Sequence, residues 1–425
     1  MNKKKVVKES NQVKLLLDPG LIARGFKIED LLGEVQLEVK SMGVSLGIMI
    51  MQKFIAAEVE ELLGKRYGRE EEKCYNWGKQ DGYVTVGGQK VHIERSRVRR
   101  GQGKGGEVVP ESYLQFQQDD ERTRRVFANM LANVSCRHYG KAIETVQQGY
   151  GISKSVVSRE MVKATKGELA QLCERRLDGI EMVVLIIDGI EVGETTFIAA
   201  LAIDTKGDKH LLGFAEGATE NADVCKELLE NLKERGLRTD RAILALLDGS
   251  KALHKAVRDF WRDKVLIHRC HEHKLRNVLS HLPKKYHPEI RQRLRAAYKM
   301  NDYTKALEAL QALLKYLERI NDSAAGSLKE GMEETLTIHR LGLPDVLRRS
   351  LVSTNIIESA YSRHRDVTHN VKRWTSAEQK RRWVATALVE AERSFRRIKG
   401  YRSMSVLVAA LERQVMKINQ TAQAA

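Results

Sequence analysis

The spacing of apolar residues changes along the chain, and each change predicts a different kind of structure. Residues 28–66 carry apolar side chains at helical intervals. From Gly82, apolar and polar residues alternate on either side of the pair Gly87-Gly88, which predicts a β-hairpin over a glycine turn. Residues 119–175 return to helical spacing. This part of the chain is therefore predicted to be mainly helical, with one small β-hairpin.

A helix-turn-helix is predicted near the end of this region. Ala142–Val146 has the apolar spacing of a short helix, and Gly149–Gly151 interrupts it. Ser153 can cap the start of a second helix through its side-chain oxygen. Lys154 and Arg159 lie at that start, where a helix that reads a DNA groove makes its contacts. An ordinary helical hairpin is the alternative.

The centre of the chain alternates between strand-length apolar runs and amphipathic helices. Strands are predicted at 182–187, 196–203, 209–214, 242–247 and 264–268, and helices at 221–235 and 250–261. The order is β-β-β-α-β-α-β, which is the order of a ribonuclease H-like α/β fold with a mixed five-stranded sheet. From 275 to 349 the pattern is almost entirely helical, and it is helical again from 355 to 400.

Two aspartates stand where predicted strands end. Asp188 directly follows the apolar run Met182–Ile187, Asp248 follows the run 242–247, and each precedes a glycine. In the predicted topology these two strands are neighbours, so both carboxylates reach the same rim of the sheet. Divalent metal would supply the counter-charge that two facing carboxylates need. The alternative is that each aspartate only forms a turn before glycine.

Glu358 is a third candidate carboxylate. Ser353 or Thr354 can start a helix, which places Glu358 in its first turns. Arg365 lies seven residues further on, two turns away and near the same face. A carboxylate and a cation in this arrangement can serve metal and phosphate together. Taken alone, the pair also fits a solvated ion pair.

The segment His268–His273 contains several possible zinc ligands within six residues. No second cluster of cysteines or histidines completes a tetrahedral site, and the spacing is not that of an HExxH helix. Structural zinc is therefore not predicted here.

Composition narrows the choice of partner and compartment. The chain has 425 residues and a formal net charge of +17, which favours a polyanion such as nucleic acid. The longest apolar stretches, such as Met182–Ile187, are far short of the roughly 20 residues of a membrane span, and no membrane partner is expected. No apolar run follows the first lysines, so no signal peptide is expected. Five scattered cysteines indicate a reduced, cytoplasmic protein.

Several motifs together resemble the Mutator-like transposases of bacterial insertion sequences. The similarity runs over about 180–400. The motifs are Ile187-Asp188-Gly189, Glu216–Asn221, Leu247–Leu253 with Asp248 and Lys251, Arg269–Leu279 with Cys270-x-x-His273, Ser353–Glu358 with Arg365, and Asn370–Trp374. Cys270-x-x-His273 looks like the C/DxxH signature of that family.

The resemblance implies a DDE transposase with Asp188, Asp248 and Glu358 as catalytic carboxylates. Two Mg²⁺ ions, for which Mn²⁺ can substitute, would be held by these three residues. The site would cut a phosphodiester at the end of the element and then activate the freed 3′-hydroxyl to attack target DNA. No covalent protein–DNA intermediate is required.

The resemblance also implies double-stranded DNA as partner, both as terminal inverted repeats and as target. Two element ends must be joined, so a homodimer is expected. Lys251 and Arg365 would steer phosphates, as would Lys372 and Arg373. Trp374 would either stack on a flipped base or pack in the core. Cys270 and His273 would brace the insertion or contact DNA, rather than bind metal.

The chain is predicted to have five parts. They are 1–115, a helical region with the hairpin and predicted DNA contact; 116–178, the helix-turn-helix; 179–274, the first part of the catalytic core; 275–350, an all-α insertion; and 351–425, the helical remainder of the core. Two other functions fit parts of the pattern. A metal-dependent nuclease would hydrolyse DNA without joining it, and a helix-turn-helix regulator would need none of the three carboxylates.

Overall fold

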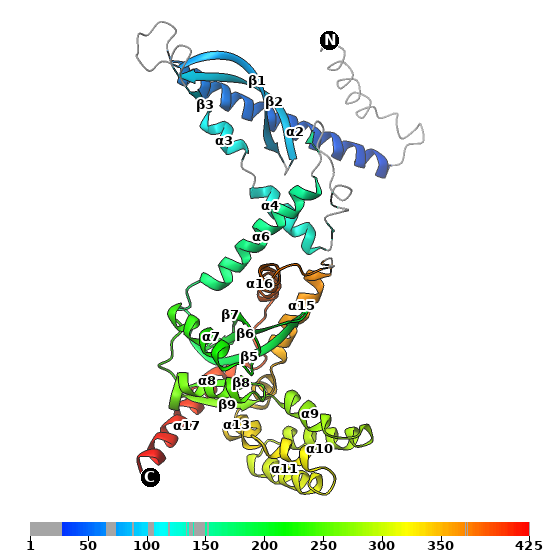
Figure 1. Ribbon diagram of the computed structural model, residues 1–425, viewed down its shortest axis with the longest axis vertical. Coiled ribbons are helices and arrows are strands. Elements are labelled where there is room, and N and C mark those ends of the chain that lie inside the picture. The colour runs from blue at the N-terminus through cyan, green and yellow to red at the C-terminus, as the bar shows by residue number, and fades with distance from the viewer. Residues whose placement is uncertain are drawn as a thin grey trace. The chain divides into compact units, whose positions relative to one another are not determined.

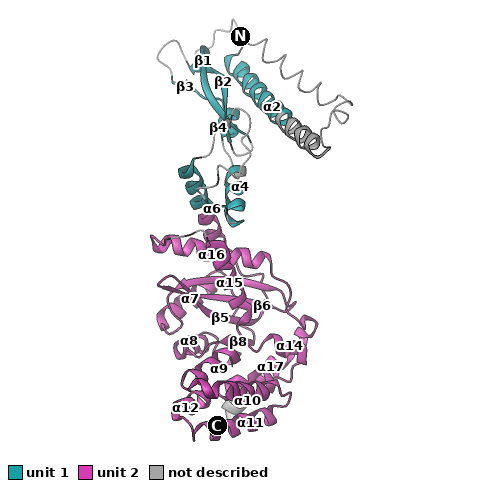
Figure 2. Cartoon of the chain, turned by 90° about the vertical axis from the view of Figure 1, so that its right-hand side faces the viewer, with its two compact units in different colours: residues 1–164 teal, residues 165–425 magenta. Residues whose placement is uncertain are grey.

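The computed structural model describes residues 28–64, 74–86, 89–100, 106–117, 120–132, 134–135, 139, 149–150, 153–369, 371 and 373–424. In helix α2 the side chains are described from Met42 onwards. The chain divides into two compact units, residues 1–164 and 165–425 (Figure 2). Each unit is described by itself.

The first unit is built on a long β-hairpin that packs against helix α2 (Ile28–Leu63). Strand β1 (Cys74–Val86) pairs antiparallel with β2 (Gln89–Arg100), so the predicted hairpin is confirmed and is longer than predicted. It also contains β3 (Glu107–Val108), α3 (Glu111–Gln117) and α4 (Asp120–Leu131), which Figure 1 labels, and β4 (Gly149–Tyr150), which Figure 2 labels. Alternate residues of β2, such as Val91 and Ile93, are buried, as expected for a sheet with one covered face.

One described helix segment is long and apolar enough to cross a membrane. Met42–Leu63 satisfies that test by length and composition alone, and little of it is buried. The expectation that no apolar stretch approaches the length of a membrane span is therefore wrong. It overlooked this stretch because Gln52 and Lys53 interrupt its apolar run.

Helix α6 (Lys154–Glu174) begins where the second helix of the predicted helix-turn-helix should begin. Ser153 caps it: the Val156 amide donates to the Ser153 hydroxyl oxygen at 3.4 Å. Lys154 and Arg159 are exposed on its first turns. The predicted first helix, Ala142–Val146, lies outside the described residues.

The second unit contains the predicted five-stranded sheet. Its strands are β5 (Met182–Val192), β6 (Thr195–Asp204), β7 (Lys209–Glu216), β8 (Ile243–Leu247) and β9 (Val265–Arg269). They lie in the order β7-β6-β5-β8-β9, with the first three antiparallel and β5, β8 and β9 parallel. The mixed sheet and the order of elements along the chain are confirmed (Figure 1).

Helices cover both faces of this sheet. Helices α7 (Ala222–Glu234) and α8 (Lys251–Trp261) bury their apolar sides on one face. The other face is covered by the end of α6 together with α13 (Thr337–Arg340), α14 (Asp345–Ser350), α15 (Asn355–Thr368), α16 (Ala377–Arg393) and α17 (Met404–Ala424). Since both faces are covered, the inner strands read as continuous apolar runs.

Asp188 lies within a strand and not at its end, so that prediction is wrong. Strand β5 continues to Val192 because it remains paired with β6, where Asp188 faces Ala199. Its pairing with the parallel neighbour β8 ends at Ile186. Asp188 therefore marks the point where β5 passes beyond the end of β8. The prediction for Asp248 is confirmed, since it directly follows β8.

A helical segment separates β9 from α15, as predicted. Its elements are α9 (His271–Ser280), η3 (Lys284–Tyr286), α10 (His287–Lys299), α11 (Tyr303–Leu317), α12 (Asp322–Lys329) and η4 (Glu333–Leu336), followed by α13 and α14. They share a core of their own that includes Leu294, Leu310 and Leu328. The insertion is thus a small helical bundle.

Buried histidines at the base of this bundle make stability depend on pH. His271 stacks on Tyr298 with ring centroids 3.7 Å apart, and its Nε2 bonds the Thr335 carbonyl at 2.7 Å. Burial lowers the pKa of His271 to about 3 and holds the pKa of His268 well below its ordinary value of 6.5. The unfolded chain therefore binds more protons than the folded one below pH 6.5, and stability falls with pH.

We expect the free energy of unfolding to decrease between pH 7 and pH 5, with about 2 kcal/mol from His271 alone at pH 5. Urea denaturation across this range measures it. His271→Asn should flatten the pH slope, whereas the exposed His281→Asn should leave it unchanged. A slope that is the same in His271→Asn and wild type would contradict the assignment.

Candidate active site

Two aspartates meet at the rim of the sheet because of strand register. Val184 pairs with Leu244 and Ile186 with Leu246 across β5 and β8. The same register, extended by two residues, places Asp188 beside Asp248. The charge of Asp248 is close enough to raise the pKa of Asp188. The predicted convergence of the two carboxylates is therefore present in the fold.

Asp188 is a buried carboxylate with few partners, only 4% exposed. Its Oδ1 accepts from the Gly189 amide at 2.9 Å, and the Tyr361 hydroxyl donates to its main-chain carbonyl at 2.8 Å. Burial raises the pKa of Asp188 to about 6, and the charge of His273 only partly offsets this. A cation at this position would stabilise the ionised form.

Asp248 is oriented by its neighbours on both sides. The Thr219 hydroxyl donates to Oδ2 at 2.9 Å, and the Ser250 amide donates to Oδ1 at 2.9 Å. Ser250 is also the N-cap of α8, so the turn that holds Asp248 starts the helix. Thr219 belongs to the Glu216–Asn221 motif at the end of β7. This motif therefore supplies the hydroxyl that orients Asp248.

Glu358 lies in the first turns of α15, as predicted, and approaches Asp188 at the Nε2 atom of His273. The Nε2 atom of His273 is 3.9 Å from Asp188 Oδ1 and 3.9 Å from Glu358 Oε1. Ligand atoms of all three residues lie within 4.8 Å of one another. Two carboxylate oxygens and an imidazole nitrogen suit a divalent cation of the first transition row, and the carboxylates alone suit Mg²⁺.

Glu358 is paired with the guanidinium group of Arg276. Its Nη2 donates to Glu358 Oε1 at 2.9 Å, and this contact raises the pKa of Arg276. The sequence pointed instead to Arg365, which is exposed on α15. His273 and Arg276 lie three residues apart on α9, so they share one face of that helix. That spacing is the signal that could have identified both.

Cys270 and His273 join the start of α9 to the start of α15 through Thr354. The amide and hydroxyl of Thr354 both lie 3.4 Å from Cys270 Sγ, and the hydroxyl is 3.4 Å from His273 Nδ1. Hydrogen bonds from His273 and Thr354 lower the pKa of the Cys270 thiol despite its burial. The contact holds together two motifs that lie far apart in the sequence.

His273 should be protonated in the metal-free protein. Its hydrogen bond to Cys270 is the largest of the causes that raise its pKa to about 9. The corresponding stability is present below pH 6.5 and is lost as the pH rises through 9. We expect Cys270→Ala to lower the pKa of His273, as measured by NMR of ring-labelled histidine with His273→Gln as the assignment control. An unchanged pKa in Cys270→Ala would contradict this hydrogen bond.

The other residues predicted to contact DNA differ in their exposure. The Lys251 ammonium lies 3.8 Å from Glu330 and is largely exposed, and Arg373 is exposed as well. Trp374 is half-buried against the core, with its ring 6.0 Å from that of His364 in a stacked arrangement. Lys372 lies outside the described residues.

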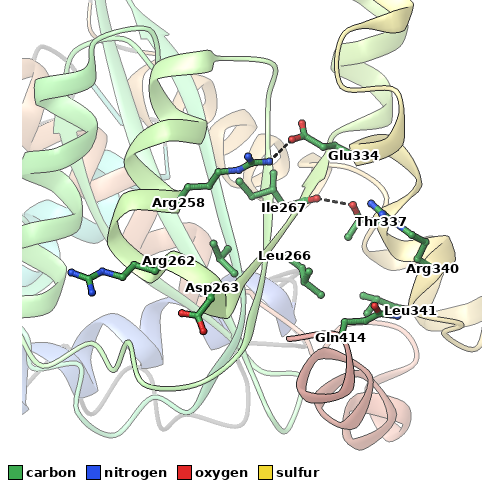
Figure 3. Close-up of a pocket in the computed structure, with 11 residues that line it drawn as sticks. Arg258, Arg262, Asp263, Leu266, Ile267, Glu334, Thr337, Arg340, Leu341 and Gln414 are labelled. Carbon is green, nitrogen blue, oxygen red and sulfur yellow. Dashed lines mark hydrogen bonds and ion pairs between the residues drawn. The ribbon is translucent and has the colours of Figure 1, made fainter. Parts of the chain in front are cut away.

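One cavity among the described residues lies away from the carboxylates. It has a volume of about 540 Å³ and is lined by the edge strand β9 together with Arg258, Arg340 and Gln414. Figure 3 shows Arg258 paired with Glu334 across it. None of the three candidate carboxylates lines this cavity.

Comparison with known proteins places this arrangement in a family. A model of the Mutator family of transposases matches residues 38–397. A transposase for insertion sequence element ISRM5 of Rhizobium meliloti (strain 1021) is 26% identical over 368 residues, which cover 84% of this chain and 89% of that protein. A transposase for IS256 in transposon Tn4001 of Staphylococcus aureus is 27% identical over 317 residues, 70% of this chain and 76% of its own.

A third relative is a transposase for IS6120 of Mycolicibacterium smegmatis, 26% identical over 239 residues, 55% of this chain and 72% of that protein. The family match spans most of the chain and includes every candidate site residue named above. The chain therefore belongs to the Mutator family of transposases, enzymes that cleave DNA and transfer its strands.

Proposed function

We propose that this transposase binds the terminal inverted repeats of an insertion sequence and cuts and joins DNA at Asp188, Asp248 and Glu358. The observation that carries this proposal is the meeting of carboxylates from three distant segments. Asp188 and Asp248 lie beside one another by strand register, and Glu358 reaches the same place from α15. A purely structural role would not require a buried carboxylate to face two others at that point.

We infer a ribonuclease H-like core. The supporting evidence is the strand order β7-β6-β5-β8-β9, with three antiparallel strands followed by two parallel ones. An aspartate on the first strand and another after the fourth are then adjacent, and the helical insertion precedes the helix that carries Glu358. The fold alone does not define the chemistry, so the assignment depends on the site.

The residues fit two divalent cations. Asp188 lies close to both other carboxylates, and Asp188, Asp248 and Glu358 together would hold the ions. Burial raises the pKa of Asp188 and the nearby His273 only partly offsets this, so a bound cation would stabilise the ionised carboxylate. When bound, Mg²⁺ would supply activation of the attacking oxygen and stabilisation of the leaving oxygen.

The surrounding side chains hold these carboxylates in place. Tyr361 fixes the main chain at Asp188, Thr219 orients Asp248, and Arg276 directs Glu358. The ring of His273, held by Cys270 and Thr354, keeps Asp188 and Glu358 facing each other. Such supporting contacts orient metal ligands and tune their affinity.

DNA would be held by cations outside this group. Lys154 and Arg159 on α6 would contact the inverted repeats, and Lys251, Arg365, Lys372 and Arg373 would steer phosphates. Trp374 would support this segment by packing on the core. The net charge of +17 supports a polyanionic partner, and a cytoplasmic location follows from a substrate in the nucleoid.

Transposition of a marker flanked by the ends of the element tests the proposed function. Wild-type protein should mobilise the marker, and Asp248→Asn should abolish mobilisation while binding to the ends is retained. Wild-type transposition frequency from Asp248→Asn would contradict the assignment.

A further inference from the structure

The imidazole of His273 faces two carboxylates at the candidate active site and is too far from either to form a hydrogen bond with it. Its Nε2 atom is 3.9 Å from Asp188 Oδ1 and 3.9 Å from Glu358 Oε1. A charged nitrogen that is hydrogen-bonded to a carboxylate lies about 2.7–2.9 Å from its oxygen. The ring therefore stands back from both carboxylates by roughly 1 Å more than a direct ion pair would require.

The spacing of these three side chains suits a shared metal ion. Small divalent ions lie about 2.0–2.2 Å from the imidazole nitrogen and carboxylate oxygen atoms that bind them. Two atoms that bind one such ion are thus about 3–4.4 Å apart, depending on whether they take neighbouring or opposite positions. Both distances from His273 Nε2 fall in this range, and ligand atoms of the three residues lie within 4.8 Å of one another. The ring and the two carboxylates can therefore converge on one ion.

Glu358 retains the capacity to bind an ion although it is paired with Arg276. The Nη2 atom of Arg276 donates to Glu358 Oε1 at 2.9 Å. Each oxygen of a carboxylate has two lone pairs, so Oε1 keeps one and Oε2 adds two more. The guanidinium group therefore fixes the direction of the Glu358 side chain without occupying all of its acceptor sites.

The other ring nitrogen of His273 is anchored as metal-bound histidines usually are. Nδ1 is 3.4 Å from the Thr354 hydroxyl, and the side chain also hydrogen-bonds Cys270. Thr354 is itself fully buried, and its amide lies 3.4 Å from Cys270 Sγ. A ligating histidine directs one nitrogen at the ion and holds the other by a hydrogen bond, which fixes the orientation of the ring. The contacts of Nδ1 therefore direct Nε2 towards the two carboxylates.

We propose that His273 is itself a metal ligand, and that its Nε2 binds the ion that Asp188 and Glu358 also hold. This proposal rests on the proposed function, because it adds a ligand to the same site. It gives His273 a different role from the one expected from sequence, in which the residue braces the insertion or contacts DNA. Ligating imidazole is neutral, so the ring releases its Nε2 proton to solvent when the ion binds.

An imidazole ligand affects which ions the site prefers. Affinity for nitrogen ligands rises along the first transition row from Mn²⁺ to Co²⁺, whereas Mg²⁺ prefers oxygen ligands. We expect His273→Gln to lower the affinity for Co²⁺ at least about tenfold and the affinity for Mg²⁺ less than about threefold. Calorimetric titration of the metal-free, full-length proteins measures both. An equal loss for the two ions would mean that the ring only positions the carboxylates, and would overturn the proposal.

Electron spin echo spectroscopy of bound Mn²⁺ identifies the ligand directly. A nitrogen atom bound to Mn²⁺ modulates the echo at frequencies of ¹⁴N, and carboxylate oxygens do not. Full-length wild type with Mn²⁺ should show this modulation, and the same protein labelled with ¹⁵N-histidine should lose it without any mutation. His273→Gln and His273→Asn should lose it as well. The control His254→Gln should keep it, since His254 donates to the Asp248 carbonyl at 3.1 Å and is not proposed as a ligand.

The outcomes separate this proposal from the proposed function. Bound Mn²⁺ without nitrogen modulation in wild type, or modulation that persists in folded His273→Gln, would overturn the role of His273 and leave the three carboxylates in place. Asp188→Asn should lose the bound ion itself. Equal binding of Mn²⁺ by wild type and Asp188→Asn, or no binding by wild type, would overturn both proposals. Circular dichroism melting shows which variants are folded, and the isotope comparison in wild type depends on none of them.

Discussion

Glu358→Gln should reduce the rate of DNA cleavage by the purified enzyme at least about a thousandfold, equivalent to ~4 kcal/mol of transition-state stabilisation. The amide keeps the shape of the side chain but loses the negative charge that would hold a divalent cation opposite Asp188. Binding to the element ends should remain within a few-fold of wild type, because the contacts proposed for the ends lie elsewhere. Single-turnover cleavage of a labelled end fragment in Mg²⁺ measures the rate, and a gel shift measures binding.

Asp366→Asn is the matched control. Asp366 lies on the same helix and is exposed. Its rate should equal that of wild type. Glu358→Gln with cleavage within about tenfold of wild type would remove Glu358 from the catalytic group, whatever the control shows.

Asp188→Asn should abolish cleavage and at the same time stabilise the metal-free protein. Burial raises the pKa of the Asp188 carboxyl from 3.8 to about 6. The folded state thus binds this proton more tightly than the unfolded state. The resulting stability is fully present below pH 3.8 and is lost as the pH rises through 6. Above pH 7 the ionised carboxylate costs roughly 3 kcal/mol relative to its protonated form, and a neutral amide avoids that cost.

Thermal unfolding in EDTA and in Mg²⁺, at pH 7.5 and above, measures both effects. Wild type should gain stability with Mg²⁺, because binding to the folded state shifts the equilibrium. Asp188→Asn should melt higher than wild type in EDTA and should gain little from Mg²⁺. The exposed Asp259→Asn is the control and should behave as wild type. A lower melting temperature for Asp188→Asn in EDTA would contradict the cost assigned to the buried charge.

Much of the second unit could be predicted from local sequence pattern. Buried strands such as β8 and capped helices such as α8, which starts at Ser250, have patterns fixed by their own residues. The end of β5 could not be predicted, because it depends on pairing with β6 and not on the residues around Asp188.

Asp188 and Asp248 could be named because each follows a predicted apolar strand, whereas Glu358 was named mainly from its motif and the family resemblance. The side chains that contact these carboxylates could not be predicted. Arg276, and not Arg365, contacts Glu358, because α9 packs beside α15 after a chain excursion of about eighty residues. The sequence identified His273 as part of the Cys270-x-x-His273 signature. It did not show that the side chain lies 3.9 Å from both Asp188 and Glu358. The spacing of His273 and Arg276 indicates one shared helix face, but which residues that face contacts depends on tertiary packing.

A strand-transfer reaction is the most direct test of the central claim, that Asp188, Asp248 and Glu358 hold the ions with which this enzyme joins DNA. Purified protein is incubated with labelled, precut element ends and a supercoiled target plasmid, and joined products are counted. The account predicts joined products from wild type only when Mg²⁺ or Mn²⁺ is present, and none from Asp188→Asn, Asp248→Asn or Glu358→Gln. Joined products from all three variants, or plasmid hydrolysis by wild type without any joining, would contradict it.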